Sequence, residues 1–212
     1  MSRYSKGEWA LIAFSAAYIA AFALYYISER NFEFLWYVAV MVFFFVLLIA
    51  TIRPAKFSIP LLWGLSTWGL LHMAGGGLQV GDHVLYAQVL LPLIQNGEMT
   101  ILKYDQVVHA FGFGVATLLV HQLMGRFIMP ERKGFSYFLI IALGGMGLGV
   151  VNEIVEFIAV LMVPDNGVGG YFNISLDLVF NTLGASIAAF SIYLYERKYR
   201  QKPTPAPAAA AL

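Results

Sequence analysis

The sequence predicts an all-α integral membrane protein: a bundle of about six transmembrane helices with an interfacial or re-entrant hairpin between the third and the fourth. Of the 212 residues, 60% are hydrophobic and 12% are charged, and the mean hydropathy is +0.74. Soluble domains are about 45–50% apolar and about 25% charged. Six apolar segments also reach the roughly 20 residues that a helix needs to cross the hydrocarbon layer.

These apolar segments follow one another along nearly the whole chain. They cover residues 9–28, 34–52, 59–80, 105–125, 135–163 and 174–195. The first segment is as long as a full span and lacks the compact basic start of a signal peptide, so we expect it to remain as a membrane helix. Residues 1–200 are expected to form one domain, and the proline- and alanine-rich tail at 201–212 is expected to be disordered.

Lysine and arginine are distributed unevenly between alternate loops. With the N-terminus inside, eleven of the 13 fall on the cytoplasmic side, and only Arg30 and Lys103 fall outside. Cytoplasmic loops carry the excess of basic residues. The sequence therefore predicts a multi-pass protein of the plasma (inner) membrane with both termini in the cytoplasm.

The stretch at 84–104 follows the third segment and is too polar to cross the membrane. Pro92 and Gly97 also interrupt it. Irregular backbone is tolerated at membrane depth only where protein or water surrounds it. We therefore expect this stretch to form the hairpin on the outer side.

The fifth segment is apolar enough to span a membrane, yet it carries two acidic residues three positions apart. On a helix, Gly145, Gly149, Asn152, Glu153 and Glu156 form one stripe. An acid near the bilayer centre costs roughly 2.5–3.5 kcal/mol, so such a residue faces a protein-lined or wet interior and marks function by default. The glycines would let a neighbouring helix approach this stripe closely.

Two other segments offer matching polar faces near their predicted outer ends. Asp105 and His109 lie four residues apart, as do Asp177 and Asn181, so each pair shares one helix face. We therefore expect the three faces to converge. The predicted catalytic residues are Asp105, His109, Glu153, Glu156, Asp177 and Asn181, with His72, Asp82 and His83 in supporting positions.

Plainer explanations exist for part of this set. Asp105 and Asp177 stand at predicted helix starts, where they would serve as N-terminal caps or as partners of the helix dipole. His72 and His109 would equally serve as hydrogen-bonding groups between helices. Such explanations fit the two glutamates of the fifth segment least.

Several carboxylates without a neighbouring arginine cannot all stay ionised in a low-dielectric site, so they share protons, bind a cation or open to water. For a bound cation, the predicted ligands are His109, Glu153 and Asp177, a mixed set that suits zinc, manganese or iron. The sequence has no cysteine, nucleophile elbow, phosphate-binding loop or His-Glu-x-x-His motif. Its net charge of +1, with scattered basic residues, argues against nucleic-acid partners.

Three short blocks, at residues 104–109, 152–156 and 177–185, resemble in order and spacing those of VanZ-like membrane proteins and more closely those of the YjdF-type inner membrane proteins of unknown function. Residues 71–73 and 82–86 are similar to the earlier blocks of the YjdF type. The similarity covers about residues 59–190. It implies a fold and a site rather than a reaction.

Residue by residue, the resemblance implies roles in the site. Asp105 and His109 take the place of the family's acid and histidine that open a helix, and Glu153 that of its first buried glutamate. Asp177 and Asn181 match its Asp-x-x-x-Asn pair. The chain departs from VanZ-like proteins where it has glutamate at 156 instead of the more usual glutamine, and asparagine at 173 instead of arginine.

Two kinds of function fit the predicted pocket. The leading hypothesis is an enzyme that acts on a lipid or lipid-linked envelope substrate at the outer leaflet, with the carboxylates and His109 as metal ligands or as acid and base. The alternatives are a proton- or cation-coupled transporter and a non-catalytic membrane scaffold. A transporter should show polar residues that continue to the cytoplasmic side, where these segments have almost none. The oligomeric state does not follow from the sequence.

Reporter fusions test the sidedness that the basic residues predict. Fusions after Lys56, Lys133 and Lys202 should report the cytoplasm, and a fusion after Asn166 should report the outside. A fusion after Lys133 that reports the outside would reverse the sidedness of the whole predicted site.

Overall fold

The computed structural model describes residues 4–30, 32–96, 99–129, 133–162 and 170–200. The tail that the sequence predicts to be disordered lies outside them. In the described residues, the chain forms six α-helices that correspond to the six apolar segments. They are α1 (Lys6–Ser28), α2 (Phe32–Ala55), α3 (Ile59–Gly77), α4 (Tyr104–Met124), α5 (Phe135–Met162) and α6 (Tyr171–Arg200).

Within the described part of the chain, five helices are long and apolar enough to cross a membrane: α1, α2, α4, α5 and α6. The sequence predicts six. α3 is not among the five, because Trp63, Trp68, His72 and its terminal glycines lower its hydropathy. The helical, multi-pass membrane character is thus confirmed, and the crossing by α3 stays a prediction.

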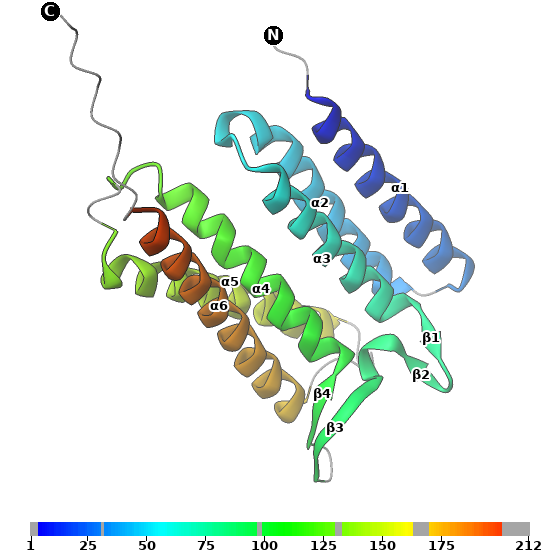
Figure 1. Cartoon of the computed structure of the whole chain (residues 1–212). Helices are drawn as coiled ribbons and strands as arrows, with labels where there is room; N and C mark the ends of the chain where they lie inside the picture. The colour runs from blue at the N-terminus through cyan, green and yellow to red at the C-terminus, as the bar shows by residue number, and fades with distance from the viewer. Residues whose placement is uncertain (1–3, 31, 97–98, 130–132, 163–169, 201–212) are drawn as a thin grey trace, which may run out of the picture.

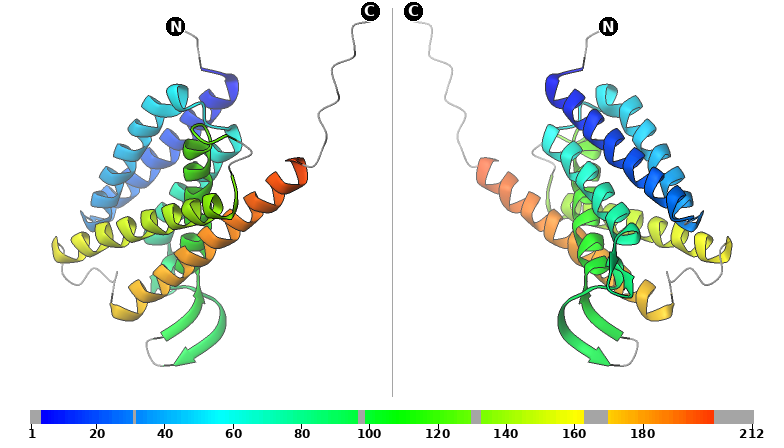
Figure 2. Two further views of the ribbon diagram at one scale, coloured as in Figure 1. Left: turned by 90° about the vertical axis from the view of Figure 1, so that its left-hand side faces the viewer. Right: turned by 90° about the vertical axis from the view of Figure 1, so that its right-hand side faces the viewer.

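The helices form two groups of three (Figure 1). α1, α2 and α3 pack together, and α4, α5 and α6 form the second group, in which α5 crosses α6 (Figure 2). The packing of α3 against α4 joins the groups. The start of α1, the end of α6 and the α2–α3 connection lie at one end of the molecule, and the strands lie at the other (Figure 1).

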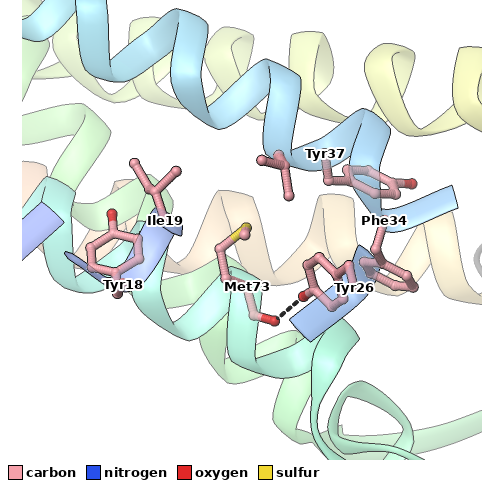
Figure 3. Packing of buried hydrophobic residues seen from close by; sticks show 7 residues of the cluster. Tyr18, Ile19, Tyr26, Phe34, Tyr37 and Met73 are labelled. Carbon is pink, nitrogen blue, oxygen red and sulfur yellow. Dashed lines mark hydrogen bonds between the residues drawn. The ribbon is translucent and has the colours of Figure 1, made fainter. Parts of the chain in front are cut away.

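An aromatic cluster holds the first group together (Figure 3). Tyr26 from α1 is fully buried against Phe34 from α2, with ring centroids 5.4 Å apart. Its hydroxyl donates to the main-chain carbonyl of Met73 in α3, at 2.5 Å. One side chain thereby connects all three helices, and the hydrogen bond satisfies a buried hydroxyl.

The connection between α3 and α4 contains two short antiparallel sheets. Its elements are β1 (Gln79–Val80), β2 (His83–Val84), the 3-10 turn η1 (Leu85–Ala87), β3 (Val89–Asn96) and β4 (Met99–Lys103). β1 pairs with β2, and β3 pairs with β4. The sequence indicated a hairpin here but no strands. The β3–β4 register is irregular between Val89 and Ile94, the stretch that contains Pro92, because proline has no N–H to donate to the ladder.

α4 and α6 make the closest approach in the second group. A Cβ atom at Gly184 of α6 would collide with the main-chain carbonyl of Ala110 in α4. Backbone cannot move aside as a side chain can, so this position requires glycine. The close approach brings the polar ends of α4 and α6 together.

Alanine at Gly184 is expected to lower the free energy of unfolding by about 1–3 kcal/mol, the usual effect of overpacking. Gly147 of α5 is the matched control, because a Cβ atom there meets nothing within 4 Å. Gly147→Ala should instead stabilise by up to about 1 kcal/mol through helix propensity. Thermal unfolding in mild detergent measures both, and equal shifts for the two variants would contradict the close approach.

Candidate functional site

The start of α4 is fixed by the side chain of Gln106. Its amide oxygen accepts hydrogen bonds from two backbone N–H groups at the end of β4, 2.7 and 3.1 Å away, and its amide nitrogen donates to the carbonyl of Thr100 at 3.0 Å. These bonds satisfy backbone groups that a helix start otherwise leaves without partners. The first turn, which carries Asp105 and is followed one turn later by His109, is therefore held against β4.

His109 lies at the centre of the polar cluster and is 3% exposed. Its Nδ1 atom is 3.0 Å from Oδ1 of Asn181 and 3.4 Å from Oε1 of Glu153. Its Nε2 atom is 3.4 Å from Oδ1 of Asp105 and 3.9 Å from Oε1 of Glu156. One imidazole thus contacts polar side chains from α4, α5 and α6.

The orientation of Asn181 determines which nitrogen of His109 carries a proton. The amide nitrogen of Asn181 donates to Oε1 of Glu153 at 3.1 Å, so the amide oxygen faces the imidazole. Because that oxygen can only accept, Nδ1 of His109 is the donor. The second nitrogen, Nε2, is then left with either a lone pair or a proton to offer to Asp105 and Glu156.

Two further asparagines hold the outer carboxylates. Asn152 donates to Glu156 at 2.7 Å. Asn173 donates to Asp177 at 2.6 Å and to Asp105 at 3.4 Å. Each amide lies four residues from a carboxylate on its own helix, so the helical repeat alone brings those two side chains together.

The cluster combines deep burial with an excess of acid. Asp177 is fully buried, and Glu153 and Glu156 are 5% and 8% exposed. No lysine or arginine in the described residues forms an ion pair with these carboxylates. One oxygen each of Glu153 and Asp177 is buried without a hydrogen-bond partner in the described structure. Such oxygens are costly unless a proton, an ion or a ligand satisfies them.

Two groups of three side chains lie close enough together for each group to hold a metal ion. One group is Asp105, His109 and Asp177, and the other is His109, Glu153 and Glu156. In each group, the candidate ligand atoms lie within 4.8 Å of one another. Each group contains two of the three ligands that the sequence predicts, so the choice of ligands stays a prediction.

All six predicted catalytic residues are buried, and the side-chain contacts above connect them. Asp177 does not cap its helix, since α6 begins at Tyr171, six residues earlier. Asp105 does lie in the first turn of α4. The dipole explanation therefore remains open for Asp105 alone.

The three predicted supporting residues are placed differently from one another. The His72 ring packs edge-on against Tyr86, with ring centroids 5.5 Å apart, and against Tyr37, with ring centroids 6.0 Å apart. Asp82 and His83 are exposed, at the turn between β1 and β2 and at the start of β2. In the described structure, neither of them contacts the polar cluster.

Two of the three amides in the site, Asn152 and Asn173, were not predicted as site residues, whereas Asn181 was. Asn152 appeared only as part of a stripe, and Asn173 only as a departure from a family pattern. Their spacing of four residues from Glu156 and Asp177 was a usable signal, because that spacing places two side chains on one helix face.

A second polar group lies toward the other end of the same three helices. His121 of α4 accepts or donates a 2.8 Å hydrogen bond with the hydroxyl of Tyr137, from α5, and lies 3.5 Å from Glu196 of α6. Lys133 pairs with Glu196 at 3.0 Å. The sequence indicated almost no polar residues in the cytoplasmic halves of these helices, so this group was not predicted.

The helices and the cluster define a class: a multi-pass helical membrane protein with a buried carboxylate and histidine centre. Residues 10–198 match the family described as predicted membrane protein (DUF2238), and the chain belongs to that family. The YjdF-type part of the resemblance is thereby confirmed, since that is the nature of this family. The match begins in α1, so it includes the first two helices, which the sequence motifs did not cover.

Other comparisons add no relatives. No curated protein and no solved structure matches the chain. The relationship to VanZ-like proteins accordingly stays a prediction, and only the site itself points to a function.

Replacing Asn181 tests whether its amide bridges His109 and Glu153. In Asn181→Leu, both buried partners lose a hydrogen bond, which is expected to cost about 1–3 kcal/mol for each unsatisfied group. Thr182→Val is the matched control, because the exposed Thr182 hydroxyl bonds only to a carbonyl of its own helix. Thermal unfolding in detergent should show a large loss for the first variant and a change within about 0.5 kcal/mol for the second. Similar losses in both would argue against the bridge.

Proposed function

We propose that this chain is a membrane enzyme that uses the carboxylate and histidine cluster, with a divalent metal ion, on a lipid or lipid-linked envelope substrate at the outer leaflet. The observation that carries the proposal is the burial of four carboxylates around one imidazole, with an unpartnered oxygen on Glu153 and on Asp177. Groups of this kind are expensive to bury and are retained where they perform chemistry.

Charge balance favours a cation. Four ionised carboxylates and one imidazolium would leave a net charge of −3 in a low-dielectric interior, which is strongly unfavourable. Protons or a metal ion must supply the missing positive charge. The candidate ligand atoms of Asp105, His109 and Asp177 lie within 4.8 Å of one another, so one metal ion could contact all three. This arrangement favours a metal ion over separate protons.

The proton on Nδ1 of His109 suggests which residues would bind the metal ion and which would only orient the histidine. Nε2 is the nitrogen with a lone pair to offer, and it faces Asp105 and Glu156. Asn181 and Glu153 then lie behind the imidazole and fix its orientation, as the outer partners of metal-bound histidines do. Zinc, manganese or iron fits this mixture of oxygen and nitrogen ligands.

A metal ion in this position would activate a water molecule or polarise an ester or phosphoryl oxygen. The chain would supply the rest of the chemistry. A carboxylate that is not a ligand, with Glu156 as the most exposed of the α5 pair, would take a proton from the attacking water. Asn152 would keep that carboxylate in place through its 2.7 Å hydrogen bond.

The position of the cluster supports a substrate from the outer leaflet. The cluster lies toward the end that carries the strands, opposite the end where the predicted cytoplasmic loops gather. A crossing by α3 is part of this topology: its 19 residues would rise about 28 Å, and it packs along α1 and α4. Six crossings would place both termini on the same side of the plasma (inner) membrane, and the distribution of basic residues predicts that this side is the cytoplasm.

The β3–β4 hairpin supports contact with lipid near the cluster. Leu90, Leu91, Leu93 and Ile94 of β3 are 47–60% exposed. Exposed leucines in a row suit the membrane interface, whereas strand edges cannot be left unpaired within the hydrocarbon layer. An interfacial hairpin is therefore the better of the two predicted placements, and it would guide a lipid headgroup toward α4.

An ion-coupled transporter is the second candidate, and one observation favours it. The polar group at His121 lies on the same three helices as the cluster, 12 residues or about 18 Å from His109 along α4. The buried Thr117 lies between them. A proton path would use all three positions, whereas an enzyme with a one-sided pocket needs only the outer cluster.

Asp177→Asn separates metal binding from proton sharing. If Asp177 is a ligand, the variant should lose most of the bound metal and unfold at a lower temperature, because metal binding stabilises the folded state. If the carboxylates only share protons, the variant removes a carboxyl that is costly to bury, so its stability should hold or rise. Metal analysis and thermal unfolding of protein purified in mild detergent measure both.

Glu196→Gln provides the matched control on the same helix. If the chain is an enzyme, this variant should keep its metal and should still restore whatever envelope function is lost in a strain that lacks the protein, because Glu196 belongs to the other polar group. Metal-free wild-type protein, together with a stabilised Asp177→Asn variant, would contradict the metal proposal. A loss of function in Glu196→Gln as severe as in Asp177→Asn would favour the transporter.

A further inference from the structure

A surface cavity of about 280 Å³ lies at the end of the bundle opposite the carboxylate and histidine cluster. Its lining residues come from the α2–α3 connection, the end of α4 and the segment before α5; they are Lys56, His121, Gln122, Gly125, Arg126 and Lys133. Small-molecule pockets have volumes of about 300–1,000 Å³. The cavity lies at the lower limit of this range, so it suits a small headgroup rather than a large ligand.

Three basic side chains line the cavity: Lys56, Arg126 and Lys133. Among the described residues, neither Lys56 nor Arg126 forms an ion pair with a carboxylate. Lys133, by contrast, pairs with Glu196 at 3.0 Å. Two cations that face one cavity and have no ion-pair partner among the described residues would be stabilised by an anion bound between them.

The cavity has a fixed frame that connects the two groups of helices. The side chain of Gln122, on α4, donates to the Ser58 hydroxyl at 2.6 Å and accepts from the Ser58 backbone N–H at 3.0 Å. The guanidinium of Arg126 lies 5.8 Å from the centre of the Phe57 ring. These contacts hold the α2–α3 connection against the end of α4, so the chain segments that carry Lys56 and Arg126 lie next to each other.

Large exposed apolar side chains lie within three residues, along the chain, of the basic residues that line the cavity. Phe127, next to Arg126, is 85% exposed, and Met129 and Phe135 are 58% and 77% exposed. A free phosphate ion would gain nothing from such neighbours. The acyl chains of a lipid would cover them while its phosphate occupied the cavity, and basic pockets between membrane helices are used for lipid headgroups in this way.

We propose that this cavity binds the phosphate headgroup of an anionic membrane lipid, with Lys56 and Arg126 as the phosphate contacts and Phe127, Met129 and Phe135 against the acyl chains. The site is separate from the carboxylate and histidine cluster. A lipid bound there joins the α2–α3 connection to the ends of α4 and α5. It thereby stabilises the packing of the two groups of helices, which otherwise depends mainly on α3 against α4.

Thermal unfolding in a neutral detergent tests the proposal with three additions: phosphatidylglycerol, phosphatidylcholine with the same acyl chains, and inorganic phosphate. Phosphatidylglycerol should raise the unfolding temperature of the wild type in a concentration-dependent way, because a ligand of the folded state stabilises it. The other two additions should have little effect. A shift with inorganic phosphate as large as that with phosphatidylglycerol would overturn the assignment to a lipid.

Lys56→Gln combined with Arg126→Gln should weaken the apparent affinity for phosphatidylglycerol by at least about tenfold, and each single change by about fivefold. Both side chains are exposed, so the variants should elute as the wild type does, and the single variants provide an independent measurement. Lys198→Gln is the matched control, since Lys198 is an exposed base at the same end that does not line the cavity. An unchanged response in the double variant, or an equal loss in the control, would overturn the proposal.

Discussion

The burial of four carboxylates around His109 is the constraint on which the second group of helices depends. Charged groups in a membrane interior must be paired, hydrogen-bonded or neutralised. In α5 and α6, three asparagines each donate a hydrogen bond to a different carboxylate of the cluster. Asn152 donates to Glu156, Asn173 to Asp177 and Asn181 to Glu153. The close approach of α4 and α6 at Gly184 is part of the same arrangement, because it brings their polar ends into contact.

The first group of helices supports the polar cluster without contributing an acid to it. Tyr86, in the turn η1, donates to the main-chain carbonyl of His72 at 2.8 Å, and Tyr104, at the start of α4, donates to that of Leu71 at 3.1 Å. Burial raises the pKa of the Tyr86 phenol well above its usual value, so this side chain acts as a neutral donor. Two tyrosines thus fasten the end of α3 to the chain segments that lead into the site.

Much of the fold could be predicted because the relevant signals are local. The six apolar segments correspond to the six helices, with boundaries within a few residues except at the end of α6. The strands were not predicted, since a hairpin of leucines and isoleucines broken by Pro92 shows no clear alternation of polar and apolar residues. Nor was the polar group at His121, because Glu196 and Tyr137 are far from it in sequence and each is unremarkable alone.

The sequence by itself determined which segments form helices and which side chains share a helix face, because apolar length and a spacing of four residues depend only on neighbours along the chain. Only the tertiary structure decided that Asn181 lies between His109 and Glu153, which are 72 and 28 residues away from it. Such contacts depend on how helices rotate and pack against one another. The same packing decided which nitrogen of His109 is the donor and left Nε2 facing two acids.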